Sequence, residues 1–168
     1  MHRVLASIFL SLFGCLILCD AAFSQTGGPT PSPPGAAVYF IGLKDGDTLP
    51  TKSTIHFGLR GMGVAPAGSD KTNSGHHHLL IDTETPPLDQ PIPNDFNHLH
   101  FGAGQTEAKI TLPLGAHKLR LLFADDAHVP HDPSVYSSEI NVIVNQTGRP
   151  PPPPQRIVRR RYIYYHHR

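Results

Sequence analysis

The chain has only two cysteines among its 168 residues and no tryptophan. Both cysteines, Cys15 and Cys19, lie in an N-terminal segment that we expect to be removed, so the remaining protein has no disulfide bond. Charged residues make up only 16% of the chain, below the roughly 25% typical of soluble domains. Together with 18 prolines, this composition disfavours long salt-bridged helices, and the length leaves room for one domain at most.

Residues 1–24 have the pattern of a secretory signal peptide. A basic start precedes an apolar run from Val4 to Leu18, and small residues at 22 and 24 suit a signal peptidase, which makes Gln25 the expected mature start. A retained membrane anchor is the alternative, but the apolar run is shorter than the roughly 20 residues that span a bilayer. Lipidation at Cys15 is a second alternative. We predict an exported protein, periplasmic or associated with the cell envelope.

Low-complexity segments flank the central part of the chain. Residues 25–36 are rich in glycine and proline and predict a flexible leader, while residues 147–155 form a proline-rich linker to a basic, aromatic tail at 156–168. The domain at 37–146 carries seven basic and twelve acidic residues, for a net charge of −5, whereas residues 147–168 carry six arginines and no acid. The tail suits an anionic envelope surface, with a solvated disordered end as the alternative. The predicted export disfavours nucleic-acid binding.

Apolar residues alternate with period two through the domain, and no run shows the 3.6-residue period of a helix. Long loops rich in glycine or proline are expected at 61–75 and 85–97. The pattern predicts an all-β fold, an immunoglobulin-like, two-sheet antiparallel sandwich of about seven strands. The expected strands are 37–43, 54–60, 76–82, 98–101, 108–112, 117–123 and 136–144.

Histidine is the most informative residue type. Nine of the twelve histidines fall in the domain, and neutral imidazole is the commonest protein ligand for zinc and copper. Residues two apart in a strand point the same way, so His98 and His100 share a face if Leu99 and Phe101 point inward. If Leu79 and Ile81 are a core pair, His76, His78 and Asp82 share a face as well, although the apolar Leu80 leaves the opposite phase open.

A third group of polar residues surrounds His128 and His131 in a loop near the end of the sandwich. We therefore expect a copper or zinc site drawn from six residues: His76, His78, His98, His100, His128 and His131. Single His-x-His pairs arise often by chance, and histidines at strand ends often serve only as hydrogen-bonding groups. His56 and His117 are expected to be of that structural kind.

The sequence offers little for enzyme chemistry. No serine lies in a nucleophile-elbow motif, the mature chain has no cysteine nucleophile, and no glycine-rich loop suits a phosphate. Glu107 is a candidate general base beside a metal-bound water, with a loop hydrogen-bonding role as the alternative. No catalytic residue is therefore assigned.

Three motifs together resemble a family of exported bacterial proteins that share a domain of unknown function. They are GHHHLLID at 75–82, HLHFGAGQTE at 98–107 and LGAHKLRLLFADDAHVPH at 114–131, and the resemblance covers roughly residues 38–144. It implies an exported bacterial protein with one small β domain, and it implies no activity, substrate or ligand.

These observations leave three hypotheses about function. The first is a non-enzymatic exported protein that binds copper or zinc, with copper favoured by the usual order of affinities. The second is a metal-free recognition module for an envelope polymer or a partner protein. The third is a metal-dependent enzyme. The sequence does not determine the oligomeric state.

Overall fold

The computed structural model describes residues 28–153, and within them the protein is entirely β, with two sheets and no helix. Accordingly, no helix in this part of the chain is able to span a membrane. The strands are β1 (Ala37–Ile41), β2 (Thr48–Pro50), β3 (Lys52–Arg60), β4 (Gly63–Val64), β5 (Ser74–Ile81), β6 (His98–His100), β7 (Glu107–Thr111), β8 (Gly115–Ala124), β9 (Pro130–Tyr136) and β10 (Ile140–Asn145).

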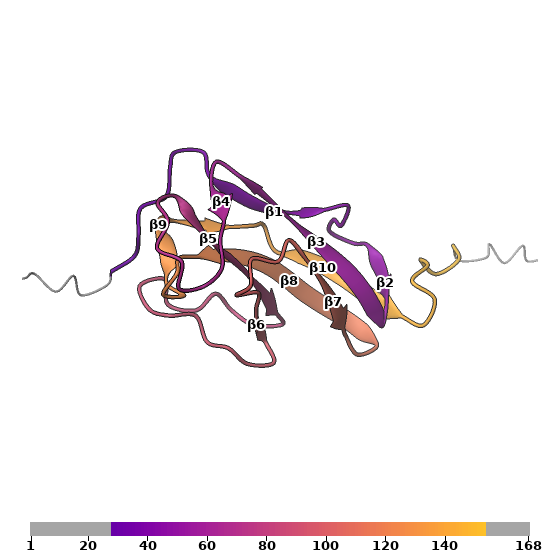
Figure 1. The fold of residues 1–168 in the computed structure, drawn as a ribbon. Coiled ribbons are helices and arrows are strands. Elements are labelled where there is room, and N and C mark those ends of the chain that lie inside the picture. Colours follow the sequence, from indigo (N-terminus) through magenta and orange to yellow (C-terminus); the bar gives the residue numbers. More distant parts are fainter. Residues whose placement is uncertain (1–27, 154–168) are drawn as a thin grey trace, which may run out of the picture.

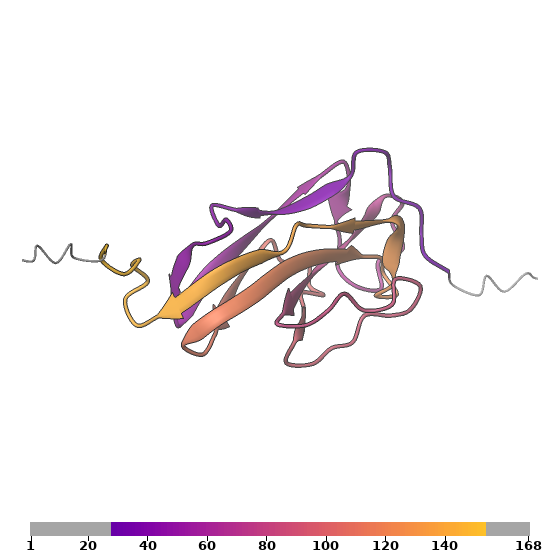
Figure 2. The same ribbon diagram turned by 180° about the vertical axis from the view of Figure 1, so that it is seen from behind.

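The two sheets form a sandwich-like arrangement of unequal layers (Figure 1). The small sheet has the order β1-β3-β7, and the large sheet has the order β2-β10-β8-β5-β4, with β6 also paired to β5 and β9 also paired to β8. Strands β4 and β6 thus share one edge of β5, while β9 and β10 share one edge of β8. Figure 2 shows the long strands β8 and β10 along one layer, with β1 of the small sheet above them in indigo.

The main core lies between the sheets and follows from the period-two alternation of the sequence. In β3 the buried side chains Ile55 and Phe57 alternate with the exposed Thr54 and His56, and in β10 every second residue from Ile140 to Val144 is buried. The inner residues Leu119, Leu121 and Phe123 of β8 are fully buried against them. These inward-facing positions of β3, β8 and β10 agree with the sequence prediction.

A second, smaller core covers the other face of the large sheet. Leu80 of β5 and Leu122 of β8 point away from the main core and pack with Ala124 and with Ile92, which comes from the proline-rich loop between β5 and β6. Because this loop covers the sheet, both faces of β5 are buried, and seven of its eight residues are buried. The face of β5 that carries His76 and His78 is therefore enclosed and not open to solvent.

The fold differs from the prediction in strand number and direction. There are ten strands rather than about seven, because three further segments also pair: β2, β4 and β9. The sandwich is also not purely antiparallel, since β2 runs parallel to β10 and β4 runs parallel to β5. These segments were not predicted as strands because they contain glycine or proline, which are typical of turns. In β9, Pro133 lies at the sheet edge, where a missing N–H is tolerated.

Part of the leader lies against the domain. Ser32 donates its backbone N–H to the carbonyl of Asp132 at 3.1 Å, and Asp132 donates in turn to the carbonyl of Thr30 at 2.9 Å. Residues 30–32 of the leader, which was expected to be flexible, thus pair with the sheet edge at β9 and satisfy backbone groups that an open edge would expose. The predicted signal peptide at 1–24 and the basic tail at 156–168 lie outside the described residues, as does the end of the linker.

Candidate metal centre

Strand β5 carries three consecutive histidines that point to opposite faces. His77 points into the main core, where its ring contacts Phe57 and Phe123 at centroid distances of 5.2 and 5.1 Å. His76 and His78 point to the other face, and each has no exposed surface. The phase with Leu79 and Ile81 in the core is therefore the one the protein adopts.

Two further histidines join His76 and His78 on this face. His100 belongs to the neighbouring strand β6 and stands directly opposite His78 in the register. His128 lies in the turn between β8 and β9, which begins just after Ala124, the residue opposite His76. Two strand pairings and one turn therefore bring together four side chains from three separate parts of the sequence.

The four imidazole rings form one compact group, which we call the four-histidine cluster: His76, His78, His100 and His128. His76 lies 4.9 Å from the ring centroids of both His78 and His100, and 5.0 Å from that of His128. The remaining centroid distances are between 4.7 and 6.1 Å. His76, His100 and His128 each offer a nitrogen within 4.8 Å of the others.

Burial keeps His76 and His78 uncharged at neutral pH. Desolvation, followed by the neighbouring imidazoles, lowers the pKa of His76 to about 4, and the same causes lower that of His78 to about 2. Desolvation also lowers the pKa of His100, with a contribution from His128. Metal ligation requires neutral imidazole, so His76, His78 and His100 are already in the protonation state that binds a cation.

Several nitrogens of the cluster are buried without a hydrogen-bond partner among the described residues: His76 Nδ1, His78 Nδ1 and His100 Nε2. Most buried side-chain polar atoms have a partner, and leaving one unsatisfied costs about 1–3 kcal/mol. A ligand that interacts with these imidazoles would offset part of that cost.

The spacing of the nitrogens suits one transition-metal ion. Nε2 of His76 and Nε2 of His78 lie 3.0 Å apart. With metal–nitrogen bonds near 2.0–2.1 Å, two nitrogens on one ion are separated by about 2.9 Å at a right angle and about 3.3 Å at a tetrahedral angle. The observed distance lies in this range, and it is also the length of a hydrogen bond between the two rings, which an ion bound by both nitrogens would replace.

His98 and His131 were also expected as ligands, but the structure does not bring them into the cluster. Nδ1 of His98 pairs with a carboxylate oxygen of Asp95 at 2.9 Å. The ring of His131 stacks on Phe123, and its Nδ1 lies 2.7 Å from the hydroxyl of Thr30. An Asp three residues before a His is a local signal for the first pairing, whereas the second depends on a residue 101 positions away in the chain.

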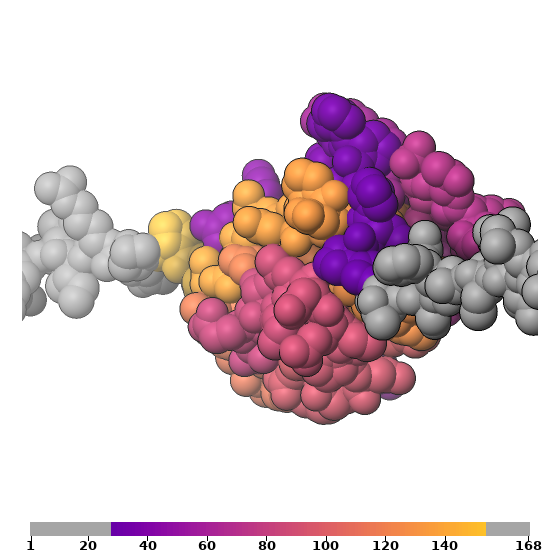
Figure 3. Space-filling model, turned by 90° about the vertical axis from the view of Figure 1, so that its left-hand side faces the viewer, coloured from indigo at the N-terminus to yellow at the C-terminus, as the bar shows by residue number. Residues whose placement is uncertain are grey.

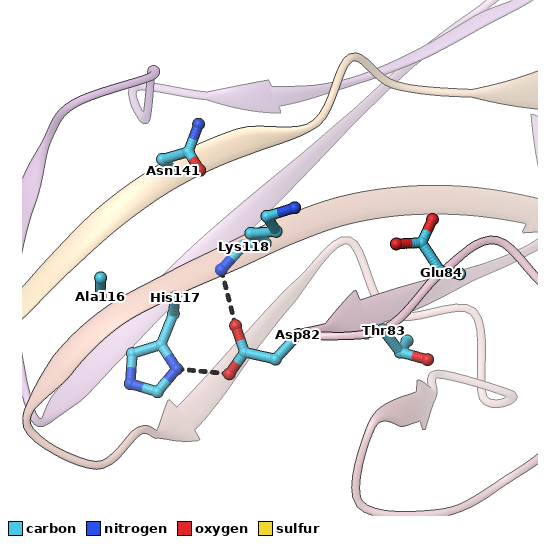
Figure 4. A pocket seen from close by; sticks show the side chains of 7 residues that line it. All are labelled: Asp82, Thr83, Glu84, Ala116, His117, Lys118 and Asn141. Atoms are coloured by element: carbon cyan, nitrogen blue, oxygen red, sulfur yellow. Dashed lines mark hydrogen bonds and ion pairs between the residues drawn. The ribbon is translucent and has the colours of Figure 1, made fainter.

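A separate polar pocket of about 630 Å³ lies over β8 and the end of β5 (Figure 4). Asp82, expected near His76 and His78, instead accepts hydrogen bonds here from Nδ1 of His117 at 2.6 Å and from the backbone of Lys118 at 2.7 Å. The other ring nitrogen of His117 pairs with the carbonyl of Pro113. Both nitrogens of His117 are thus in use, which confirms its structural role.

Glu107, the candidate general base, belongs to the small sheet. Its carboxylate pairs with Nδ1 of the exposed His56 at 3.0 Å, opposite it in the register. Both residues belong to the small sheet, whereas His76, His78 and His100 belong to strands of the large sheet. The interpretation of Glu107 as a hydrogen-bonding residue therefore fits the structure better than a base beside a metal.

Sequence reasoning did not identify His77 as a core residue. Its Nδ1 pairs with the carbonyl of Gln105 at 3.2 Å, and burial lowers its pKa to about 4. Residues 76–78 are all histidine, so only the apolar residues that follow them in β5 indicate which histidine points inward.

The fold and the site define a small all-β protein with a buried histidine cluster on one face of its larger sheet. A family described as a domain of unknown function, DUF4399, matches residues 55–145, and the chain belongs to this family. The match contains all three motifs that suggested such a family and leaves β1 and the leader outside it. The chain matches none of the curated proteins and none of the solved structures.

Proposed function

We propose that this protein is an exported, non-enzymatic binder of a transition-metal ion, copper or zinc, and that the four-histidine cluster is its binding site. The observation that carries the proposal is the convergence of His76, His78, His100 and His128 within ring distances of 4.7–6.1 Å. Three of these residues belong to the two His-x-His pairs, His76/His78 and His98/His100. The fourth, His128, comes from the group around His128 and His131.

The donor set favours copper(II) or zinc(II). All four donors are imidazole nitrogens of borderline softness, and no carboxylate contacts the rings in the described residues, which disfavours magnesium or calcium. Where geometry does not discriminate, copper(II) binds such a site more tightly than zinc(II). We therefore propose copper as the preferred ion. The predicted signal at 1–24 supports an exported location, and the sandwich is proposed to be immunoglobulin-like in architecture.

The proposal is tested by titrating tag-free protein with copper(II) and with zinc(II) in a calorimeter. We expect one ion per chain with a dissociation constant below micromolar. The His100→Ala variant loses a direct ligand, so its affinity should fall by more than the roughly 10- to 100-fold typical of lost supporting hydrogen bonds.

His98→Ala is the matched control, because His98 lies in the same strand, two residues from His100, and pairs with Asp95. Its affinity should equal that of the unaltered protein. Equal losses in the two variants, or binding no tighter than micromolar in the unaltered protein, would reject the proposed site. Histidines of the C-terminal tail are present in every variant and contribute equally to each titration.

A further inference from the structure

His128 is held in place differently from the other members of the four-histidine cluster. His76, His78 and His100 are fixed by strand pairing, whereas His128 lies in a turn and has a positive φ of 69°. Residues other than glycine rarely adopt this left-handed conformation, which is unfavourable by itself and persists only when the surroundings impose it. Something in the turn must therefore hold His128 in this conformation.

The buried carboxylate of Asp125 supplies these restraints. Its Oδ1 accepts hydrogen bonds from the backbone N–H groups of Ala127 at 3.0 Å and Val129 at 2.9 Å, the residues on either side of His128. The carbonyl of Asp125 also accepts from the N–H of His128 at 3.1 Å. Only 4% of the surface of Asp125 is exposed, so water competes little for these bonds.

The leader completes this support. The hydroxyl of Thr30 donates to Oδ2 of Asp125 at 3.2 Å, and since its single proton is used there, it accepts the Nδ1–H of His131 at 2.7 Å. Figure 3 shows the surface of this end of the molecule, where the leader appears in indigo and the β5–β6 loop in pink. That loop contributes one more contact, from the N–H of Ile92 to the carbonyl of His128 at 2.9 Å.

We propose that Asp125, secured by Thr30 of the leader, is the positioning residue that fixes His128 as the fourth metal ligand. This inference rests on the proposed function of the cluster. Asp125 itself does not bind the ion in this scheme: both its oxygens are engaged by the turn and the leader. It acts by presenting the imidazole of His128 toward His76 and His100.

The experiment compares copper(II) binding by the full protein and by Asp125→Ala. Affinity should fall by about 10- to 100-fold, the usual effect of removing a support of a metal ligand. Electron paramagnetic resonance should show fewer coordinated nitrogens, as in His128→Ala. Asp125→Asn keeps an oxygen for the turn and should retain most of the affinity. Asp82→Ala is the matched control, because Asp82 also joins a histidine to a backbone N–H, but at His117.

A double-mutant cycle shows whether Asp125 acts through His128. In a His128→Ala background, the further change Asp125→Ala should leave copper affinity unchanged within about twofold. An equal loss in both backgrounds would overturn the inference, as would an Asp125→Ala protein that keeps the full nitrogen count. If Asp125→Ala does not fold, Thr30→Val tests the same support. Its copper affinity should fall by less than that expected for Asp125→Ala, and an unchanged affinity would overturn the inference.

The two proposals fail in distinguishable ways. If the unaltered protein binds no copper or zinc, the proposed function fails and this inference fails with it. If the unaltered protein binds the ion through four nitrogens, and neither Asp125→Ala nor Thr30→Val alters that binding, only the positioning role of Asp125 is wrong.

Discussion

Gly102 shows how closely the chain surrounds a residue of the four-histidine cluster. A Cβ atom added to Gly102 would overlap the Cε1 and Nε2 atoms of the His100 ring, because the backbone of Gly102 passes directly beneath the imidazole. In the sequence, a glycine two residues after a strand indicates only a turn. Its contact with a site residue appears only once the chain is folded.

We predict that Gly102→Ala weakens metal binding although it removes no ligand. The added methyl group must displace the His100 ring, so copper affinity should fall by at least about 10-fold, as for other losses of ligand orientation. Gly28→Ala is a suitable control, because a Cβ there would meet no atom within 4 Å. Calorimetric titration gives the comparison, and unchanged affinity of Gly102→Ala would contradict the described packing of His100.

The buried histidines also predict how stability depends on pH in the presence of a chelator. Because the folded-state pKa of His76 and His77 is about 4 against an ordinary value of 6.5, the unfolded chain binds more protons between these values. The free energy of unfolding should therefore fall as pH decreases from about 6.5 to 4, by up to about 1.4 kcal/mol per histidine and pH unit. Denaturant titrations at several pH values measure this slope, which should be shallower in His77→Phe.

At the scale of elements, the loop between β5 and β6 converts an exposed sheet face into an enclosed one. Ile92 is 5% exposed and packs on Leu80 and Leu122, while its backbone N–H binds the carbonyl of His128. The loop thus buries the face that carries His76 and His78. Burial of this face causes the lowered pKa of both residues.

We expect Ile92→Ala to lower the free energy of unfolding by about 2–5 kcal/mol, the usual range for a buried isoleucine. Leu88 in the same loop is 36% exposed, so Leu88→Ala should have a clearly smaller effect. Urea denaturation of both variants makes the comparison. Similar losses in the two would indicate that the loop does not pack on the sheet through Ile92.

For the whole molecule, the domain has no disulfide and is stabilised by its two hydrophobic cores. A bound ion would stabilise the folded state further, because it binds the folded protein and not the unfolded chain. A ligand at 100 times its dissociation constant stabilises the folded state by about 2.7 kcal/mol. We predict that copper(II) raises the melting temperature by roughly 10 °C and that a chelator reverses the change. His98→Ala should keep this shift and His100→Ala should lose it; a shift retained in His100→Ala would place the stabilising ion elsewhere.

The sequence by itself determined the β architecture, the inward residues of β3, β8 and β10, and the pairing of His76 with His78 on one face. These features depend on the period-two geometry of a strand, which each segment carries locally. The two-residue strand β4 and the proline-containing strand β9 were not predicted, since their pairing depends on neighbours in other parts of the fold.

Only the tertiary structure decided which histidines meet. His98 and His100 are equivalent in the sequence pattern, yet His98 pairs with Asp95 and His100 lies opposite His78. His128 reaches the cluster because the β8–β9 turn folds next to the start of β5, and Thr30 of the leader donates a hydrogen bond to Asp125 in that turn. Local alternation fixes the direction of a side chain, but strand register and loop packing determine what it contacts.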